Sequence, residues 1–132
     1  MSNKKIGTDF ENELCEILSS YGYWVHPMRQ DASGQPADII AVKDKKAYLI
    51  DAKVCSNDKF DLRRMEENQD LAMELWRECG NGVGWFAFKL RNEIYMLSHY
   101  CIKAYKQHQS YLSPQEIADL GLPFERWVKK CS

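Results

Sequence analysis

Three charged residues stand near the ends of two strongly apolar segments. Asp38 opens the run Ala37–Val42 (ADIIAV), while Asp51 and Lys53 fall near the end of Ala47–Val54 (AYLIDAKV). Side chains alternate along a β-strand, so Asp51 and Lys53 point to the same face if the second run is a strand. Two carboxylates that face one point form a hard-oxygen site suited to Mg²⁺ or Mn²⁺. A neighbouring lysine can orient a water molecule or, as the neutral amine, deprotonate it, and as the ammonium it can stabilise charge on a phosphate.

The same residues also allow a structural interpretation. A charged Asp51–Lys53 pair interrupts an otherwise apolar strand. Buried charge is costly unless it is paired or bound to a metal. The two residues could therefore form a structural ion pair, or could mark a strand end that emerges into solvent. The physics of the strand alone leaves these alternatives open.

Hydrophobic periodicity predicts the elements that must position the charged residues. The polar link 43–46 between the two apolar runs predicts a β-hairpin, which could bring Asp38 close to Asp51 and Lys53. Before the hairpin, the pattern predicts a helix over Asp9–Tyr21, with Thr8 as N-cap and Gly22 as its stop, then a strand over Tyr23–His26 and a loop over Met28–Gln35. After the hairpin, it predicts a helix over Arg63–Cys79, whose inward-facing residues are Met65, Leu71, Ala72, Leu75, Trp76 and Cys79. A second hairpin follows, from Val83–Leu90 and Glu93–Ser98, and then helices over His99–Gln109, from Ser113 and over Pro123–Lys130. This order predicts an α/β domain with a mixed central sheet flanked by helices.

Length and composition limit the class of protein. A chain of 132 residues is long enough for one domain with a single core, so residues 1–132 are predicted to form one domain. Lys and Arg number 18 against 19 Asp and Glu, which excludes a uniformly basic nucleic-acid coat but not a local basic surface. The five cysteines form no CxxC motif, and no segment resembles a signal peptide or a membrane span. We therefore expect a cytoplasmic protein with reduced thiols and no membrane partner.

The two charged segments resemble a known nuclease signature. Pro36-Ala37-Asp38 followed by Asp51-Ala52-Lys53 resembles the PD-(D/E)xK motif, with an alanine between Pro and Asp and with Asp where many members have Glu. Three flanking segments are similar to archaeal-type Holliday junction resolvases: the opening helix at Gly7–Leu14, the turn at Gly22–Val25 and the Arg and Ser-Gly loop at Arg29–Gly34. The resemblance covers residues 6–98 as a nuclease core, which leaves 99–132 as a helical C-terminal extension.

The resemblance implies a restriction-endonuclease-like core that hydrolyses DNA phosphodiesters with Mg²⁺, or with Mn²⁺ in its place. Asp38, Asp51 and the main-chain carbonyl of Ala52 would hold the metal, and Glu11 would complete its shell directly or through water. Lys53 would position the attacking water. On the residues alone, Glu11 has another role open, because Thr8 and Glu11 match a helix capping box.

The resemblance also suggests contacts to DNA. Arg29 and Ser33 would contact a phosphate near the metal, where Ser33 would join the catalytic set, and Gln69 sits where related nucleases often carry Gln. Further candidates for phosphate contacts are the basic residues that flank the metal site in sequence: Lys43, Lys45, Lys46, Lys59, Arg63 and Arg64. The acid-free segment after Ile94, with Lys103 and Lys106 among tyrosines, suits either a nucleic-acid surface or an ordinary amphipathic helix.

The predicted function is that of a Mg²⁺-dependent, structure-specific DNA endonuclease, similar to Holliday junction resolvases, that acts on branched DNA in recombination and repair. Resolution of a four-way junction cuts two opposed strands, so we expect a symmetric homodimer. Another endonuclease of the same superfamily (restriction-like, nicking or repair) is an alternative, because fold analogy does not fix the substrate. A non-catalytic DNA-binding module on the same fold is a second alternative, which the retention of all four charged residues disfavours. A purely structural or protein-interaction domain is a third.

Overall fold

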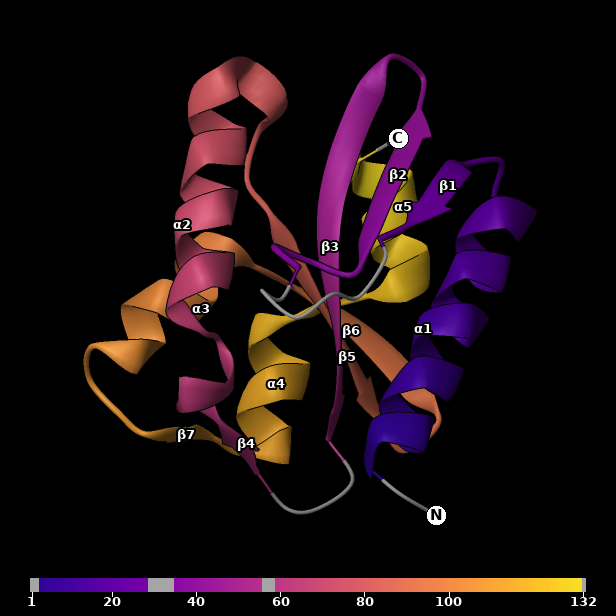
Figure 1. Ribbon diagram of the computed structural model, residues 1–132. Helices are drawn as coiled ribbons and strands as arrows, with labels where there is room; N and C mark the ends of the chain where they lie inside the picture. Colours follow the sequence, from indigo (N-terminus) through magenta and orange to yellow (C-terminus); the bar gives the residue numbers. More distant parts are fainter. Residues whose placement is uncertain (1–2, 29–34, 56–58, 132) are drawn as a thin grey trace.

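The computed structural model describes residues 3–28, 35–55 and 59–131. Its centre is a six-stranded sheet in the order β1-β2-β3-β5-β6-β8 (Figure 1). β3 and β5 are parallel, and the other neighbours are antiparallel. The strands are β1 (Trp24–Pro27), β2 (Ile39–Lys43), β3 (Lys46–Cys55), β5 (Trp85–Leu90), β6 (Glu93–Ser98) and β8 (Leu122–Pro123), and a small second sheet pairs β4 (Phe60–Asp61) with β7 (Tyr111–Leu112). The predicted mixed α/β fold is confirmed.

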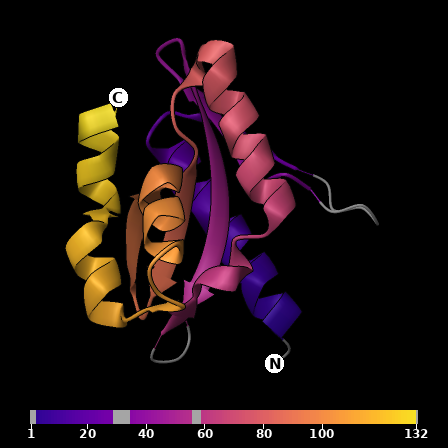
Figure 2. The same cartoon turned by 90° about the vertical axis from the view of Figure 1, so that its left-hand side faces the viewer.

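Helices cover both faces of the sheet. Tyr48 and Ile50 of β3 belong to one apolar cluster and Leu49 belongs to another, as strand alternation requires. The first cluster packs against α1 (Asn3–Ser20) and α5 (Phe124–Cys131), and the second takes residues from α2 (Glu67–Trp76), α3 (His99–Lys106) and α4 (Pro114–Leu120). Figure 2 shows α5 and α2 on opposite sides of the sheet. Short helical turns, η1 (Leu62–Arg64) and η2 (Arg77–Asn81), flank α2.

The predicted hairpin between β2 and β3 is confirmed. Asp44 and Lys45 at its turn both have positive φ, 53° and 68°, as a two-residue type I′ turn requires. The turn sets the register, which pairs Ile39 with Ile50. Asp38 directly precedes β2, and its amide donates to the carbonyl of Ile50 at 3.1 Å. The hairpin therefore places Asp38 alongside Asp51.

The first helix is longer than predicted. It begins at Asn3 rather than Asp9, so Thr8 lies inside it and is not the N-cap. The capping-box explanation for Glu11 is therefore wrong. An ion pair of 3.2 Å between Lys5 and Asp9, four residues apart, supports the additional turns. The stop at Gly22 is as expected, with φ of 90° just after the helix.

The helix predicted over Arg63–Cys79 differs in both bounds and buried face. Its α-helical part is shorter, because Glu66 forms a capping box with Gln69 and so begins α2 at Glu67. The buried side chains of α2 are Gln69 and Met73. Leu71 and Leu75 are each 61% exposed, so their predicted inward direction is wrong. Of the other residues predicted to face inward, Met65 is buried, Ala72 and Trp76 are half-buried, and Cys79 is exposed.

The C-terminal helices agree closely with the sequence pattern. Ser98 caps α3, and Ser113 forms the predicted capping box with Glu116 at the start of α4. The fully buried Trp127 of α5 packs its ring against those of Tyr23 and Tyr48. These contacts attach α5 to the face of the sheet that also receives α1.

Candidate active site

The carboxylate of Asp38 is held from two sides. Its Oδ1 accepts a hydrogen bond of 3.0 Å from Nε2 of Gln35, and its Oδ2 accepts one of 2.8 Å from the amide of Ala52. The residue is only 9% exposed. Because the second bond comes from β3, it fixes the carboxylate of Asp38 directly beside the Asp51-Ala52-Lys53 segment. The predicted convergence of Asp38 with that segment is confirmed.

Asp51 is the most deeply buried charged residue of the site, at 1% exposure. Its Oδ1 accepts a hydrogen bond of 3.1 Å from Nε2 of Gln69. Its Oδ2 lies 3.0 Å from Nζ of Lys53 but receives no well-directed hydrogen bond. The Lys53 ammonium offsets the charge of this oxygen, but no directed hydrogen bond occupies its lone pairs. This oxygen therefore fits a metal ligand.

Lys53 is also fixed in place. Besides its ion pair with Asp51, its Nζ donates to the carbonyl of Arg64 at 3.0 Å and lies 3.5 Å from Oε1 of Gln69. Asp51 and Lys53 lie two residues apart on β3, opposite Phe86 and Phe88 of β5. The ammonium is thereby held at the same face of the sheet as the carboxylate.

Glu11 approaches the site from α1. Burial disfavours its charged form, and the nearby carboxylates of Asp38 and Asp51 add to the effect, so that its pKa rises to about 8 despite the opposing charge of Lys53. Burial is also the main cause that raises the pKa of Asp51 to about 7, with Lys53 opposing the shift and Asp38 adding to it. Two carboxyl groups with raised pKa, next to the carboxylate of Asp38, form the oxygen-rich environment that a divalent cation neutralises.

Of the predicted DNA contacts around residues 59–64, Arg64 lies next to Lys53. Arg64 contributes its carbonyl to Lys53, and its Nη1 donates to the carbonyl of Val54 at 3.2 Å. Arg63 is bound to Asp61 at 2.6 Å, and the Nζ of Lys59 lies 4.1 Å from the centre of the Tyr111 ring. Arg29 and Ser33 lie outside the described residues.

The other predicted basic group is not adjacent to the site. Lys43, Lys45 and Lys46 lie at the turn of the β2–β3 hairpin. Lys46 precedes Asp51 by five residues of β3, which is about 17 Å of strand. The amine of Lys43 is bound to the carbonyl of Tyr21 at 2.8 Å. These lysines are close to Asp38 and Asp51 in the sequence but distant from them in space, because β3 extends away from the site.

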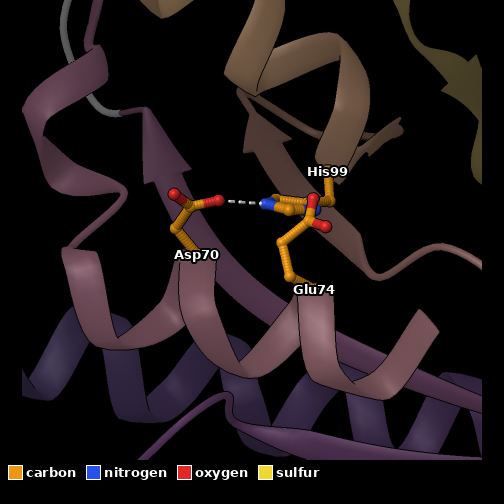
Figure 3. Close-up of side chains that lie close together, drawn as sticks. All are labelled: Asp70, Glu74 and His99. Carbon is orange, nitrogen blue, oxygen red and sulfur yellow. Dashed lines mark hydrogen bonds and ion pairs between the residues drawn. The ribbon is translucent and has the colours of Figure 1, made fainter. Parts of the chain in front are cut away.

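Sequence reasoning missed a second polar cluster, which joins α2 to α3 (Figure 3). His99 is 1% exposed, and its Nε2 donates to Oδ1 of Asp70 at 2.6 Å. Burial opposes ionisation of Asp70, but the His99 hydrogen bond and the Lys103 charge outweigh it and lower the pKa of Asp70. No local pattern links residues that lie 29 positions apart, so the sequence offered no signal for this contact.

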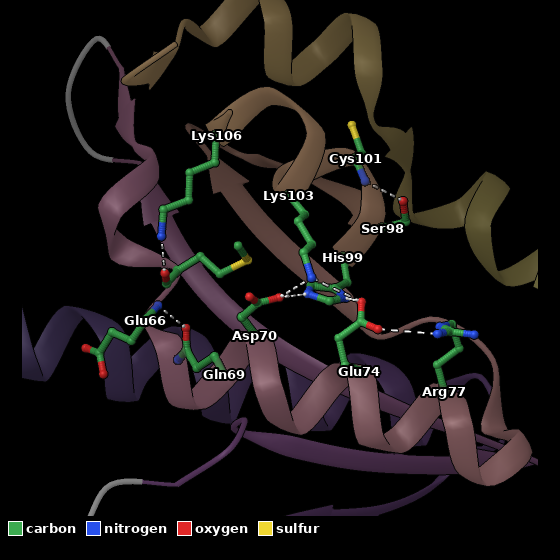
Figure 4. Close-up of polar contacts among 11 residues, drawn as sticks. Glu66, Gln69, Asp70, Glu74, Arg77, Ser98, His99, Cys101, Lys103 and Lys106 are labelled. Atoms are coloured by element: carbon green, nitrogen blue, oxygen red, sulfur yellow. Dashed lines mark hydrogen bonds and ion pairs between the residues drawn. The ribbon is translucent and has the colours of Figure 1, made fainter. Parts of the chain in front are cut away.

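The same cluster contains metal-ligand residue types but already has its own cation. One ligand atom each of Asp70, Glu74 and His99 lies within 4.8 Å of the others. The Nζ of Lys103 lies 3.4 Å from a carboxylate oxygen of both acids, and Arg77 binds Glu74 at 3.3 Å (Figure 4). The negative charge is thus balanced by side chains. Lys106 donates to the carbonyl of Met65, so both Lys103 and Lys106 are engaged in contacts within the protein.

A mixed sheet that presents two buried aspartates and a lysine at one point, with a glutamate from the first helix, defines a nuclease of the PD-(D/E)xK class. The profile of the archaeal Holliday junction resolvase (Hjc) family matches residues 2–132, and the chain belongs to this family. A search of curated proteins finds no match.

A solved structure supports the assignment of the fold. Hjc, a Holliday junction resolvase from the archaeal hyperthermophile Archaeoglobus fulgidus, is similar to this chain with a TM-score of 0.72 and 16% identity, over 92% of this chain and 99% of that chain. At this identity, the similarity shows that the two share a fold. The family match also includes residues 99–132, for which the sequence motifs had given no counterpart.

Family membership confirms the predicted activity. Members of the family are structure-specific, metal-dependent DNA endonucleases that bind four-way junctions and cleave phosphodiester bonds in recombination and repair. The restriction-like and non-catalytic alternatives have no corresponding support. Within the described ranges, no helix is both long and apolar enough to cross a membrane.

Proposed function

We propose that this chain resolves four-way DNA junctions by Mg²⁺-dependent hydrolysis at a site formed by Glu11, Asp38, Asp51 and Lys53. The single observation that carries the proposal is the buried Oδ2 of Asp51, which lies 3.0 Å from the Lys53 ammonium without a directed hydrogen bond. The carboxylate oxygen of Asp51 and the ammonium of Lys53 are thus held side by side, where both can contact a phosphate and the water that attacks it.

The donor set fits a hard divalent cation. Asp38, Asp51 and the carbonyl of Ala52 would hold the metal, and Glu11 would complete the set directly or through a water molecule. Mg²⁺ prefers such oxygen ligands, and Mn²⁺ accepts the same set. When bound, the metal polarises the scissile phosphate and lowers the pKa of the attacking water. The hydrogen bonds to Asp38 leave a second lone pair on each of its carboxylate oxygens.

The remaining steps fall to side chains that orient and bind. Lys53, held by the Arg64 carbonyl and by Gln69, would orient the attacking water and stabilise the charge that develops on the phosphate. Gln69 would keep Asp51 and Lys53 in their relative positions. Arg29 and Ser33 would contact the phosphate near the metal, a proposal that rests on the resemblance of their segment to the family. Lys59, Arg63 and Arg64 would contact the DNA backbone beyond it.

A homodimer would supply the second active site that cleavage of two opposed strands requires. The outer face of α2 is a suitable interface, because Leu71 and Leu75 lie one turn apart and are each 61% exposed. Asn68, one turn earlier, donates to the carbonyl of Gln35 at 3.4 Å, so this face borders the segment that leads into Asp38. We propose that each copy is a single nuclease domain over residues 1–132.

The test compares purified wild type with Asp51→Ala on a four-way junction and on linear duplexes of the same sequences. We expect Mg²⁺-dependent cleavage of the junction by the wild type, and binding without cleavage by Asp51→Ala. Asp44→Asn, which changes an exposed aspartate at the turn of the same hairpin and keeps a side chain that tolerates the positive φ there, is the matched control and should cleave normally.

Three outcomes would contradict parts of the proposal. Cleavage by Asp51→Ala at the wild-type rate would exclude the metal site. Equal cleavage of the junction and the duplex would indicate another endonuclease activity of the superfamily. The absence of cleavage with any divalent cation would indicate a binding module.

A further inference from the structure

The C-terminal helix α5 presents a cationic face to solvent. Phe124, Trp127 and Val128 are buried, and the ring of Trp127 contacts those of Tyr48 and Trp85, at centroid distances of 5.2 and 5.8 Å. These contacts fix the rotation of the helix about its axis. The exposed positions are Glu125 and the three basic residues Arg126, Lys129 and Lys130, which are spaced i, i+3 and i+4 on one face.

The turn of the β2–β3 hairpin adjoins this face. The Tyr48 hydroxyl donates to the carbonyl of Cys131 at the end of α5. Lys45, Lys46 and Cys131 also line one cavity of about 370 Å³. In Figure 1, the hairpin turn and the C-terminal end of α5 lie at the same end of the molecule. We use the name α5–hairpin surface for the group Lys45, Lys46, Arg126, Lys129 and Lys130.

The cations of this surface differ from most others in the protein. Among the other described Lys and Arg side chains, most are engaged, as Lys53 is with Asp51, Lys89 with Glu13 and Lys103 with Asp70, whereas Lys4 and Arg91 are not. Within residues 3–28, 35–55 and 59–131, no hydrogen bond, ion pair or ring contact engages any side chain of the α5–hairpin surface. The acidic residues on the same two segments are Asp44 and Glu125. A chain with a net charge of -1 thus concentrates five free cations in one region.

We propose that the α5–hairpin surface binds the phosphate backbone of duplex DNA, as a second contact separate from the catalytic one. Unpaired ammonium and guanidinium groups on flexible stems bind phosphates with release of counterions, without any need for base contacts. Lys46 lies about 17 Å of strand from Asp51, which equals about five base pairs of duplex. The surface therefore binds DNA outside the scissile region. This inference goes beyond the proposed catalytic site and does not depend on it.

The test removes the charges of α5 without touching its buried face. The triple variant Arg126→Gln/Lys129→Gln/Lys130→Gln is compared with the charge-retaining Arg126→Lys/Lys129→Arg/Lys130→Arg. Junction and linear-duplex affinities are measured in EDTA over a series of salt concentrations. For the Gln variant we expect a Kd about 10-fold higher at low salt and a salt slope smaller by about 2 to 3, because each phosphate contact contributes roughly 0.9 to that slope.

Two further readouts separate this surface from the active site. In the Gln variant, the affinities for the junction and for the linear duplex should fall by the same factor, because phosphate contacts do not distinguish branched from linear DNA. The kcat of this variant at saturating junction should stay at the wild-type value. The charge-retaining variant should bind as the wild type does. Wild-type Kd and salt slope in the Gln variant would overturn the inference. So would unchanged DNA binding with loss of binding to anionic phosphatidylserine vesicles, since the surface would then be a membrane contact. Failure of the catalytic proposal shows instead in Asp51→Ala, through cleavage and not through binding.

Discussion

The side-chain amide of Gln69 donates to Oδ1 of Asp51 at 3.1 Å. Its Oε1 accepts from the amide of Glu66 at 3.3 Å and lies 3.5 Å from Nζ of Lys53. An amide has one donor side and one acceptor side, so it can meet a carboxylate and an ammonium at once. The first turn of α2 is thereby tied to both charged residues of the Asp-x-Lys segment.

Replacement of Gln69 should impair the chemical step more than DNA binding. In Gln69→Ala, Asp51 and Lys53 lose their common partner, and misplacement of catalytic groups lowers rates steeply. We expect kcat on a four-way junction to fall about 10-fold or more, with the Kd for the junction unchanged, as measured by single-turnover cleavage and binding in EDTA. Glu67→Gln, at an exposed position two residues earlier, is the control. An unchanged kcat in Gln69→Ala would show that the amide has no role in positioning.

The metal-free protein should lose stability as pH rises toward 8. Asp51 has its pKa raised from 3.8 to about 7, mainly by burial, and the pKa of Glu11 is raised to about 8. Between the unfolded and folded pKa values, the folded state holds protons that the unfolded state has released, so the free energy of unfolding falls with increasing pH. The fall due to Asp51 should occur between about pH 4 and pH 7 and that due to Glu11 should extend to about pH 8.

The variant Asp51→Asn isolates this effect. It removes the buried charge and keeps the shape of the side chain, at the cost of the ion pair with Lys53. We expect the variant to be about 2 kcal/mol more stable than the wild type at pH 8 without metal, and to have a flatter pH profile. Urea unfolding in EDTA across this pH range measures both. Identical pH profiles for the two proteins would mean that the charge of Asp51 does not destabilise the folded state.

The hairpin and its charged residues could be predicted because short-range rules determine them. A two-residue turn fixes the register of β2 and β3, and the register places Asp38 beside Asp51. The buried face of α2 could not be predicted in the same way. Its apolar residues Leu71 and Leu75 are exposed, while the polar Gln69 is buried because it pairs with Asp51. A tertiary polar contact here outweighs the hydrophobic pattern of the helix.

The distribution of free positive charge likewise requires the fold. Lys103 and Lys106 lie in an acid-free segment of the sequence, yet the structure pairs Lys103 with Asp70 of α2 and Lys106 with the carbonyl of Met65 just before that helix. The sequence order of the basic residues also suggested that Lys45 and Lys46 flank the metal site, whereas the length of β3 separates them from it. Which cations remain unpaired depends on partners that are distant in sequence, and local patterns carry no information on those.

Charged substitutions on the outer face of α2 should separate the proposed dimer. In Leu71→Glu/Leu75→Glu, two exposed leucines become acidic, and like charges would meet across a symmetric interface. We expect light scattering to give half the wild-type mass, with the far-UV circular dichroism unchanged because neither side chain is buried. Tyr100→Glu, at a 44% exposed position on α3, is the control and should remain dimeric. A wild-type protein that is monomeric at micromolar concentration would refute the proposed dimer.

The contact between His99 and Asp70 should stabilise the position of α2. His99 donates to Asp70 at 2.6 Å from a site with 1% exposure, and Asp70 is the residue directly after Gln69 (Figure 4). His99→Leu removes the donor and leaves Asp70 facing an apolar side chain, so we expect a loss of about 2 kcal/mol in the free energy of unfolding. His99→Gln can still donate to the carboxylate and should recover part of the loss. Urea unfolding of the three proteins measures both effects.

A double-mutant comparison shows whether this contact also reaches the active site. If the His99–Asp70 bond acts on catalysis by holding Gln69 against Asp51, His99→Leu should lower kcat in the wild-type background but not in Gln69→Ala, since the affected contact is then already absent. Glu74→Gln, one turn further along α2 in the same cluster, leaves the His99–Asp70 bond intact and should keep the wild-type kcat. If His99→Leu lowers kcat equally in the wild-type and Gln69→Ala backgrounds, the cause is general destabilisation of the fold. If Glu74→Gln lowers kcat as much as His99→Leu does, the cause is the charge of the cluster rather than this hydrogen bond.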